Sequence, residues 1–136
     1  MGVPRVLVIE DDDGARNGLR SLLSEEGYSV RTAESGRAAL HCASEFQPDA
    51  VVCDFDLPDF DGLQVVRRLR ATGQDIFIIM VTAGRYRAIE ERALRTEADV
   101  FLVKPINLDL LRGALRRVAS APDTTRALRL KGPTDA

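Results

Sequence analysis

Short apolar runs alternate with longer amphipathic segments along this chain. Four runs are rich in β-branched residues and bounded by polar residues, Gly or Pro, a pattern that predicts strands buried on both faces. A fifth segment, Ser29–Ala33, alternates polar and apolar residues, which predicts an edge strand with one face in solvent. The four apolar runs are Val6–Ile9, Ala50–Cys53, Ile76–Val81 and Val100–Val103.

Between the strands, apolar residues recur at the spacing of amphipathic helices. Ser35 and Asn107 each precede such a segment and are predicted N-caps, while either Asp12 or Asp13 suits that role for the first helix. The apolar stripes, in chain order, are Ala15, Leu19, Leu22 and Leu23; Leu40, Ala43 and Phe46; Leu63, Val66 and Leu69; Ile89 and Ala93; and Leu108, Leu111, Leu115 and Val118.

The order strand–helix, repeated five times, is typical of parallel strands joined by right-handed helical crossovers. The predicted fold class is therefore α/β, a three-layer sandwich in which helices cover both faces of a five-stranded parallel sheet. Ligands bind such sheets beyond the carboxyl ends of the strands. Residues 1–120 are expected to form the domain, and residues 121–136 a polar tail or the start of a linker.

Composition excludes several classes of protein. The 136 residues, 45% hydrophobic and 29% charged, fit one globular domain, and a net charge of −2 gives no basic field for direct nucleic-acid binding. One histidine and two cysteines exclude a His-rich metal site, a four-ligand zinc site and a disulfide framework. Because the chain has no signal peptide and no apolar run near the roughly 20 residues of a membrane helix, a cytoplasmic location without membrane contact is expected.

Polar residues follow the central strands. Glu10 and Asp11 follow the first, Asp54 the third, Thr82 the fourth and Lys104 the fifth. Each of these residues, taken alone, also suits a helix cap, a strand end or a surface charge. Their joint placement at one edge of the sheet favours a ligand-binding site. Clustered carboxylates require a cation, and oxygen-only ligands suit Mg²⁺. Beside a metal ion and an ammonium group, a central carboxylate can act as a nucleophile toward a phosphoryl group.

Four segments at these strand ends form a recognisable set. They are VLVIEDD at 6–12, Asp54 with LPDFDG at 57–62, VTA at 81–83 and FLVKP at 101–105. With this set the chain resembles, over roughly residues 4–120, the receiver domain of bacterial two-component response regulators. The resemblance implies a flavodoxin-like (βα)5 fold with strand order 2-1-3-4-5. It also implies a phosphorylation-switched signalling module that catalyses only its own phosphoryl transfer and dephosphorylation.

The resemblance also implies the roles of individual residues. Asp54 is the implied phosphoacceptor, loaded by a histidine kinase or a histidine phosphotransfer protein. Glu10, Asp11 and Asp54 are the implied Mg²⁺ ligands, together with the main-chain carbonyl of Asp56.

A switch and a readout surface are implied as well. Thr82 and Phe101 form the implied switch pair, and Lys104 is implied to contact the phosphoryl group. The peptide bond between Lys104 and Pro105 is implied to be cis. The implied readout is binding of an effector domain or partner protein at the face of the fourth helix, fifth strand and fifth helix. Phosphorylation-dependent dimerisation through this domain is a further expectation.

The sequence departs from the commonest receiver pattern at four positions. Glu10 replaces the more usual first Asp, and Glu97 stands where Gly often precedes Ala-Asp. Gly84 leaves the position two residues after Thr82 without a side chain, while Asp56 adds an acid two residues after the acceptor. These departures are compatible with the phosphoryl-transfer chemistry that the resemblance implies, but they do not fix the rates of phosphorylation and dephosphorylation.

Two alternatives come from other functional classes. One is a receiver used as an unphosphorylated scaffold, which would neither bind Mg²⁺ nor accept a phosphoryl group. The other is a phosphatase of the haloacid dehalogenase type, because Asp54-Phe55-Asp56 resembles its DxD motif, although that motif follows the first strand in those enzymes. Outside the site, Cys53 is predicted to be an inert core thiol, and the run Arg67, Arg68 and Arg70 a solvated face.

Overall fold

The computed structural model describes residues 2–84, 92 and 97–120. The predicted fourth helix, with Ile89 and Ala93, and the predicted tail 121–136 lie outside the described residues. Among the helices that are described, none has the length and apolar character needed to cross a bilayer. The strands are β1 Arg5–Ile9, β2 Ser29–Ala33, β3 Ala50–Asp54, β4 Phe77–Thr82 and β5 Val100–Val103, and the helices are α1 Asp13–Glu25, α2 Gly36–Phe46, α3 Gly62–Ala71 and α5 Leu108–Ser120.

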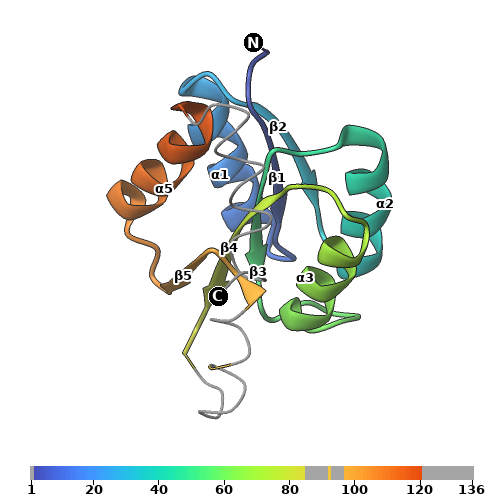
Figure 1. The fold of residues 1–136 in the computed structure, drawn as a ribbon. Coiled ribbons are helices and arrows are strands. Elements are labelled where there is room, and N and C mark those ends of the chain that lie inside the picture. The colour runs from blue at the N-terminus through green and yellow to red at the C-terminus, as the bar shows by residue number, and fades with distance from the viewer. Residues whose placement is uncertain (1, 85–91, 93–96, 121–136) are drawn as a thin grey trace.

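The five described strands form one parallel sheet in the order β2-β1-β3-β4-β5 (Figure 1). This order confirms the predicted flavodoxin-like topology. The register sets Ile9 of β1 beside Cys53 of β3, and Asp54 beside Val81 of β4. The carboxyl ends of the three central strands therefore meet at one edge of the sheet.

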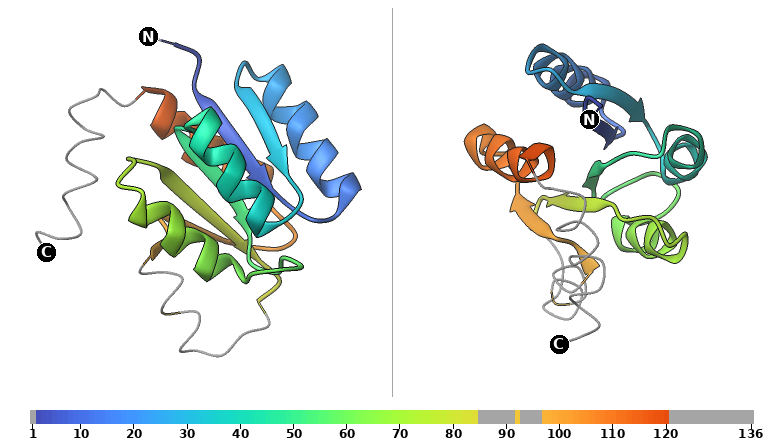
Figure 2. Two further views of the ribbon diagram at one scale, coloured as in Figure 1. Left: turned by 90° about the vertical axis from the view of Figure 1, so that its right-hand side faces the viewer. Right: turned by 45° about the horizontal axis from the view of Figure 1, so that its top comes forward.

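Helices cover both faces of this sheet, with α1 and α5 on one face and α2 and α3 on the other (Figure 2). Because successive strand residues point to opposite faces, each central strand contributes to two cores. Leu7 and Ile9 of β1 belong to the core cluster that includes Leu69 of α3. Val8 belongs to the cluster that includes Leu115 of α5. The three-layer sandwich is confirmed.

Strand β5 differs from the prediction that its run would be buried on both faces. Of its four residues only Leu102 is buried, and Val103 is 52% exposed. The physical reason is position, because β5 ends the strand order and borders the sheet rather than lying within it. A short apolar sequence alone does not distinguish an edge strand from a central one.

Each described helix begins behind a polar cap. The carboxylate of Asp12, rather than that of Asp13, accepts a hydrogen bond from a first-turn N–H of α1 at 2.8 Å. Ser35 caps α2 and Asn107 caps α5, as predicted, and Asp61 caps α3. A cap of this kind contributes about 1 kcal/mol, so these polar residues fix where each loop ends and each helix starts.

Candidate functional site

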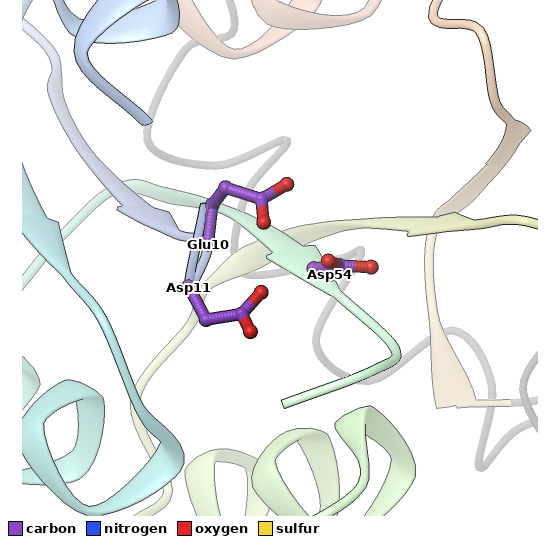
Figure 3. Close-up of side chains that lie close together, drawn as sticks. All are labelled: Glu10, Asp11 and Asp54. Atoms are coloured by element: carbon purple, nitrogen blue, oxygen red, sulfur yellow. The ribbon is translucent and has the colours of Figure 1, made fainter. Parts of the chain in front are cut away.

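Three carboxylates meet at the carboxyl edge of the sheet (Figure 3). Glu10 and Asp11 directly follow β1, and Asp54 is the last residue of the adjacent strand β3. Their nearest oxygens all lie within 4.8 Å of one another. Glu10 and Asp54 are 5% and 4% exposed, whereas Asp11 is exposed to solvent. The cluster therefore has two desolvated acids and one at its mouth.

The ammonium group of Lys104 closes the cluster from the side of β5. Its Nζ lies 3.1 Å from Asp54 Oδ2 and 3.4 Å from Glu10 Oε1. Strand alternation explains the meeting, since these three residues continue the face on which the preceding Val8, Val52 and Leu102 point toward α1 and α5. The long lysine side chain is needed because β4 separates β3 from β5.

Burial and neighbouring charges shift the pKa values of Glu10 and Lys104. Desolvation raises the pKa of Glu10, and the charge of Asp54 adds to this, while the N–H of Asp12 and the charge of Lys104 work in the opposite direction. Burial acts to lower the pKa of Lys104, but its hydrogen bond and ion pair with Asp54 and its contact with Glu10 leave that pKa raised. Lys104 is thus held as a cation between the carboxylates of Asp54 and Glu10.

The neighbouring thiol does not take part. Cys53 is completely buried in the α2–α3 core. Desolvation, followed by the charges of Asp54 and Glu10, raises the pKa of this thiol well above its usual range. Cys53 therefore stays protonated, which agrees with the predicted inert core thiol.

The loop after β3 points main-chain groups at the acceptor candidate. The N–H of Asp56 lies 3.3 Å from Asp54 Oδ1, while the Asp56 side chain is exposed. Asp54 Oδ1 therefore faces the loop, whereas Oδ2 faces Lys104. The carboxylate is held from two sides in one orientation.

Thr82 lies at the neighbouring strand end. Its side chain is fully buried, and its Oγ1 accepts a hydrogen bond from the N–H of Gly84 at 3.1 Å. The main-chain N–H of Lys104 donates to the Thr82 carbonyl at 2.7 Å, so the two residues are fixed side by side. Gly84 adopts a φ of +80°, a conformation that L side chains rarely adopt, which gives a backbone reason for the missing side chain there.

Phe101 shares a sheet face with Thr82. The Phe101 ring is partly buried against the α2–α3 core cluster that contains Met80, and Thr82 follows Met80 by two residues along β4. The Lys104–Pro105 peptide bond is cis. The switch role of Thr82 and Phe101 stays a prediction.

Sequence reasoning missed the role of Asp59. Its carboxylate accepts hydrogen bonds from the N–H groups of Gly36 and Arg37 at 2.8 and 2.9 Å, at the start of α2. These bonds, with that from Phe60, lower the pKa of Asp59. A Cβ at Gly36 would lie 2.4 Å from the Phe60 ring, so glycine there allows the loop to approach. The acidic run after β3 therefore ties the site loop to α2.

The predicted solvated face of α3 is wrong for Arg70. Its guanidinium donates to the carbonyls of Ile76 and Glu97 and pairs with Asp99 at 2.9 Å. Asp99 also accepts from the N–H of Ile78. Arg70 thus joins the end of α3 to the segments before β4 and β5, a long-range contact that the local pattern does not reveal.

The donor set fits a hard divalent cation. Carboxylate oxygens without His or Cys ligands are what Mg²⁺ prefers, and Mg²⁺ keeps several waters beside one or two carboxylates. Glu10 and Asp54 are buried and repel each other, so a bound cation would be stabilised electrostatically between them. Asp11, at the exposed side, can complete such a site.

Sheet order and acidic cluster together define the class of protein: a flavodoxin-like α/β domain with its ligand site at the strand ends. Residues 6–116 match the family model of the response regulator receiver domain. The chain belongs to this family, and so to the proteins of two-component signal transduction.

Curated relatives agree with the family. Response regulator MprA of Mycolicibacterium vanbaalenii is 43% identical over 112 residues, which make up 82% of this chain and 48% of that protein. Response regulator MprA of Mycobacterium avium is 41% identical over 123 residues, covering 88% and 54% respectively. The chain thus spans about half the length of these relatives.

Solved structures share the fold. Response regulator TrrA of Thermotoga maritima, in complex with Mg²⁺ and BeF, is 33% identical with a TM-score of 0.76, covering 85% of this chain and 99% of that one. Chemotaxis protein CheY4 of Vibrio cholerae is 29% identical with a TM-score of 0.78, covering 86% and 99% respectively.

Proposed function

We propose that this chain acts in the cytoplasm and accepts a phosphoryl group on Asp54 from a phosphohistidine of a histidine kinase or histidine phosphotransfer protein, with Mg²⁺ as cofactor. The observation that carries the proposal is the setting of Asp54. This carboxylate is buried, is bonded to Lys104 at 3.1 Å and lies among two further acids within 4.8 Å. A structural aspartate would gain nothing from acidic neighbours that repel it.

In the proposed transfer, one carboxylate oxygen of Asp54 attacks the phosphorus of the donor. The new O–P bond replaces the P–N bond, and the donor imidazole leaves with the electron pair of that bond. Lys104 is placed to neutralise phosphoryl oxygens once its contact with Asp54 is exchanged for them. Hydrolysis of the acyl phosphate by water would then restore the free carboxylate.

Glu10, Asp11 and Asp54 would hold the Mg²⁺ ion, with the main-chain carbonyl of Asp56 as a further ligand. When bound, the ion supplies neutralisation of the developing phosphoryl charge. The chain's own part is to bring ligands of two strands together, which the β1–β3 register achieves. TrrA, a relative of known structure, was solved with Mg²⁺ and BeF, which supports this choice of cation.

The readout surface is proposed to be the face of β5, α5 and the helix predicted before β5. A groove of about 330 Å³ lies between β5 and α5, lined by residues that include Val100, Leu102, Leu110 and Gly113. Leu110 is 58% exposed beside it. An effector domain or partner protein with an apolar side chain is the proposed occupant, and phosphorylation-dependent pairing of two copies is the other outcome of a binding test.

Incubation with acetyl phosphate and Mg²⁺, followed by intact mass spectrometry, tests the acceptor. The wild type is expected to gain one phosphoryl group, and Asp54→Asn is expected to gain none. Asp109→Asn, at an acid that is 92% exposed on α5, is the matched control and should label like the wild type. Labelling of Asp54→Asn would refute the assignment, and an unlabelled wild type would favour the scaffold alternative.

The phosphatase alternative is less well supported than the receiver function, and sustained turnover of a phosphomonoester would favour it. The DxD motif of those phosphatases belongs after a first strand, whereas Asp54 ends β3, a central strand of a receiver-type sheet, and Asp56 lies just beyond it. The scaffold alternative is decided by the acetyl phosphate experiment.

A further inference from the structure

Arg16, in the first turns of α1, points back at the loop that carries two of the acids. Its Nη1 lies 3.0 Å from the main-chain carbonyl of Glu10 and 3.4 Å from that of Asp11. Its Nη2 pairs with the carboxylate of Asp13. The Arg16 side chain is only 14% exposed, so the guanidinium is packed into this loop rather than extended into solvent.

We infer that Arg16 is a positioning residue of the Mg²⁺ site, an inference that rests on the proposed function. A main-chain carbonyl and the side chain of the same residue share one Cα, so fixing the carbonyls of Glu10 and Asp11 restricts where their carboxylates point. Glu10 Oε2 also accepts from the N–H of Asp12 at 3.0 Å, which completes the restraint on that ligand.

The choice of acceptor atoms matters. Arg16 bonds to carbonyl oxygens of Glu10 and Asp11, and its ion pair goes to Asp13, which lies outside the acidic cluster. The ligand oxygens thus stay available to a cation while the backbone behind them is held. Groups that hydrogen-bond to the ligand residues, rather than to the metal ion itself, typically change metal affinity ten- to a hundredfold when they are removed.

Electrostatics alone makes the opposite prediction. A guanidinium near the site repels a divalent cation, so its removal should tighten Mg²⁺ binding if charge repulsion dominates. Removal should weaken binding if orientation of the ligands dominates. The sign of the change therefore separates the two effects, and it is independent of whether Asp54 later accepts a phosphoryl group.

The test is a Mg²⁺ titration followed by amide chemical shifts in ¹H–¹⁵N NMR spectra. Arg16→Met keeps an unbranched, apolar stem and removes every donor. Arg16→Lys keeps the charge and one set of donors but loses the planar fork. Arg20→Met, at an exposed arginine one turn along the same helix, is the matched control.

Arg16→Met is expected to raise the Mg²⁺ dissociation constant roughly ten- to a hundredfold, Arg16→Lys to recover part of the loss, and Arg20→Met to leave it unchanged. Melting temperatures with and without Mg²⁺ give a second readout, in which the metal-induced increase shrinks for Arg16→Met. If Arg16→Met loses native amide shifts throughout, Arg16→Lys carries the comparison.

Two results would overturn the inference. Arg16→Met that is natively folded and binds Mg²⁺ as tightly as the wild type, or more tightly, would show that Arg16 does not position the ligands. A wild type that does not bind Mg²⁺ would remove the proposed function, and the inference with it.

Discussion

Two backbone segments approach closely near the site at Gly62, the first residue of α3. A Cβ placed on Gly62 would lie 2.7 Å from Phe55 Cα, 2.9 Å from the Asp54 carbonyl oxygen and 3.0 Å from Met80 Sδ. The N–H of Gly62 donates to the Phe55 carbonyl at 2.7 Å, which fixes this approach. Gly62→Ala therefore forces the loop after Asp54 to move.

The size of the effect follows from these contacts. Two of the clashing atoms are backbone, which cannot rotate away, and forced overpacking of this kind costs about 1–3 kcal/mol. Alanine gains up to about 1 kcal/mol of helix propensity over glycine, and less than that at a first helical position. We therefore expect Gly62→Ala to lower the free energy of unfolding by about 1–2 kcal/mol.

Gly113 on α5 is the matched control, because a Cβ there meets nothing within 4 Å. Gly113→Ala should raise the free energy of unfolding by about 0.5–1 kcal/mol. Urea denaturation followed by circular dichroism measures both, and the acetyl phosphate assay should show slower labelling for Gly62→Ala alone. A Gly62→Ala variant as stable as the wild type would refute the packing argument.

Four further predictions concern single side chains of the site. Thr82→Ala should still be phosphorylated, but the amide shifts around Phe101 should respond less; an undiminished response would break the proposed coupling. Because burial raises the pKa of Glu10, the contribution of this residue to stability is lost as pH rises through its folded pKa. Without Mg²⁺, Glu10→Gln should therefore resist urea better than the wild type at neutral pH, and the difference should close in acid. Equal urea midpoints for the two proteins at every pH would contradict this. Because the folded pKa of Asp59 is lowered, the contribution of this residue to stability is present at neutral pH and lost in acid. Asp59→Asn should therefore be less stable than the wild type at neutral pH, and its melting temperature should fall less than that of the wild type as the pH is lowered. Asp56→Asn should lengthen the lifetime of the phosphorylated form in intact mass spectra, with Mg²⁺ binding largely unchanged, because it removes a negative charge and a group able to orient the attacking water; equal or faster decay would exclude that role.

The sequence predicted the fold closely because central strands of a parallel sheet are continuous apolar runs. The prediction Val6–Ile9 became β1 Arg5–Ile9, and Val100–Val103 was reproduced as β5. The acids and the lysine at the strand ends were found for the same reason, since strand ends of a parallel sheet share one edge. The exposure of β5 was not predictable, because edge position depends on strand order.

Long-range polar contacts could not be read from the chain. Arg16, Asp59 and Arg70 each bond to main-chain groups that a local pattern of apolar and polar residues does not identify. A basic run on a helix is the same sequence signal whether its side chains reach solvent or a neighbouring loop. Arg70 differs from a solvated arginine only because β4 and β5 begin beside the end of α3.

The four aspartates from Asp54 to Asp61 show how one residue type serves two purposes within eight positions. Asp54 has its carboxylate at the site, and Asp56 has its main-chain N–H there. Asp59 and Asp61 instead accept from N–H groups that open α2 and α3, where anions are favoured by the unpaired donors and the helix dipole. In the loop after β1 the charge is reversed, because the guanidinium of Arg16 donates to the main-chain carbonyls of Glu10 and Asp11. The two loops that carry the proposed ligands are thus each fixed through main-chain groups by a charge of suitable sign, which leaves the ligand carboxylates themselves available to the metal ion.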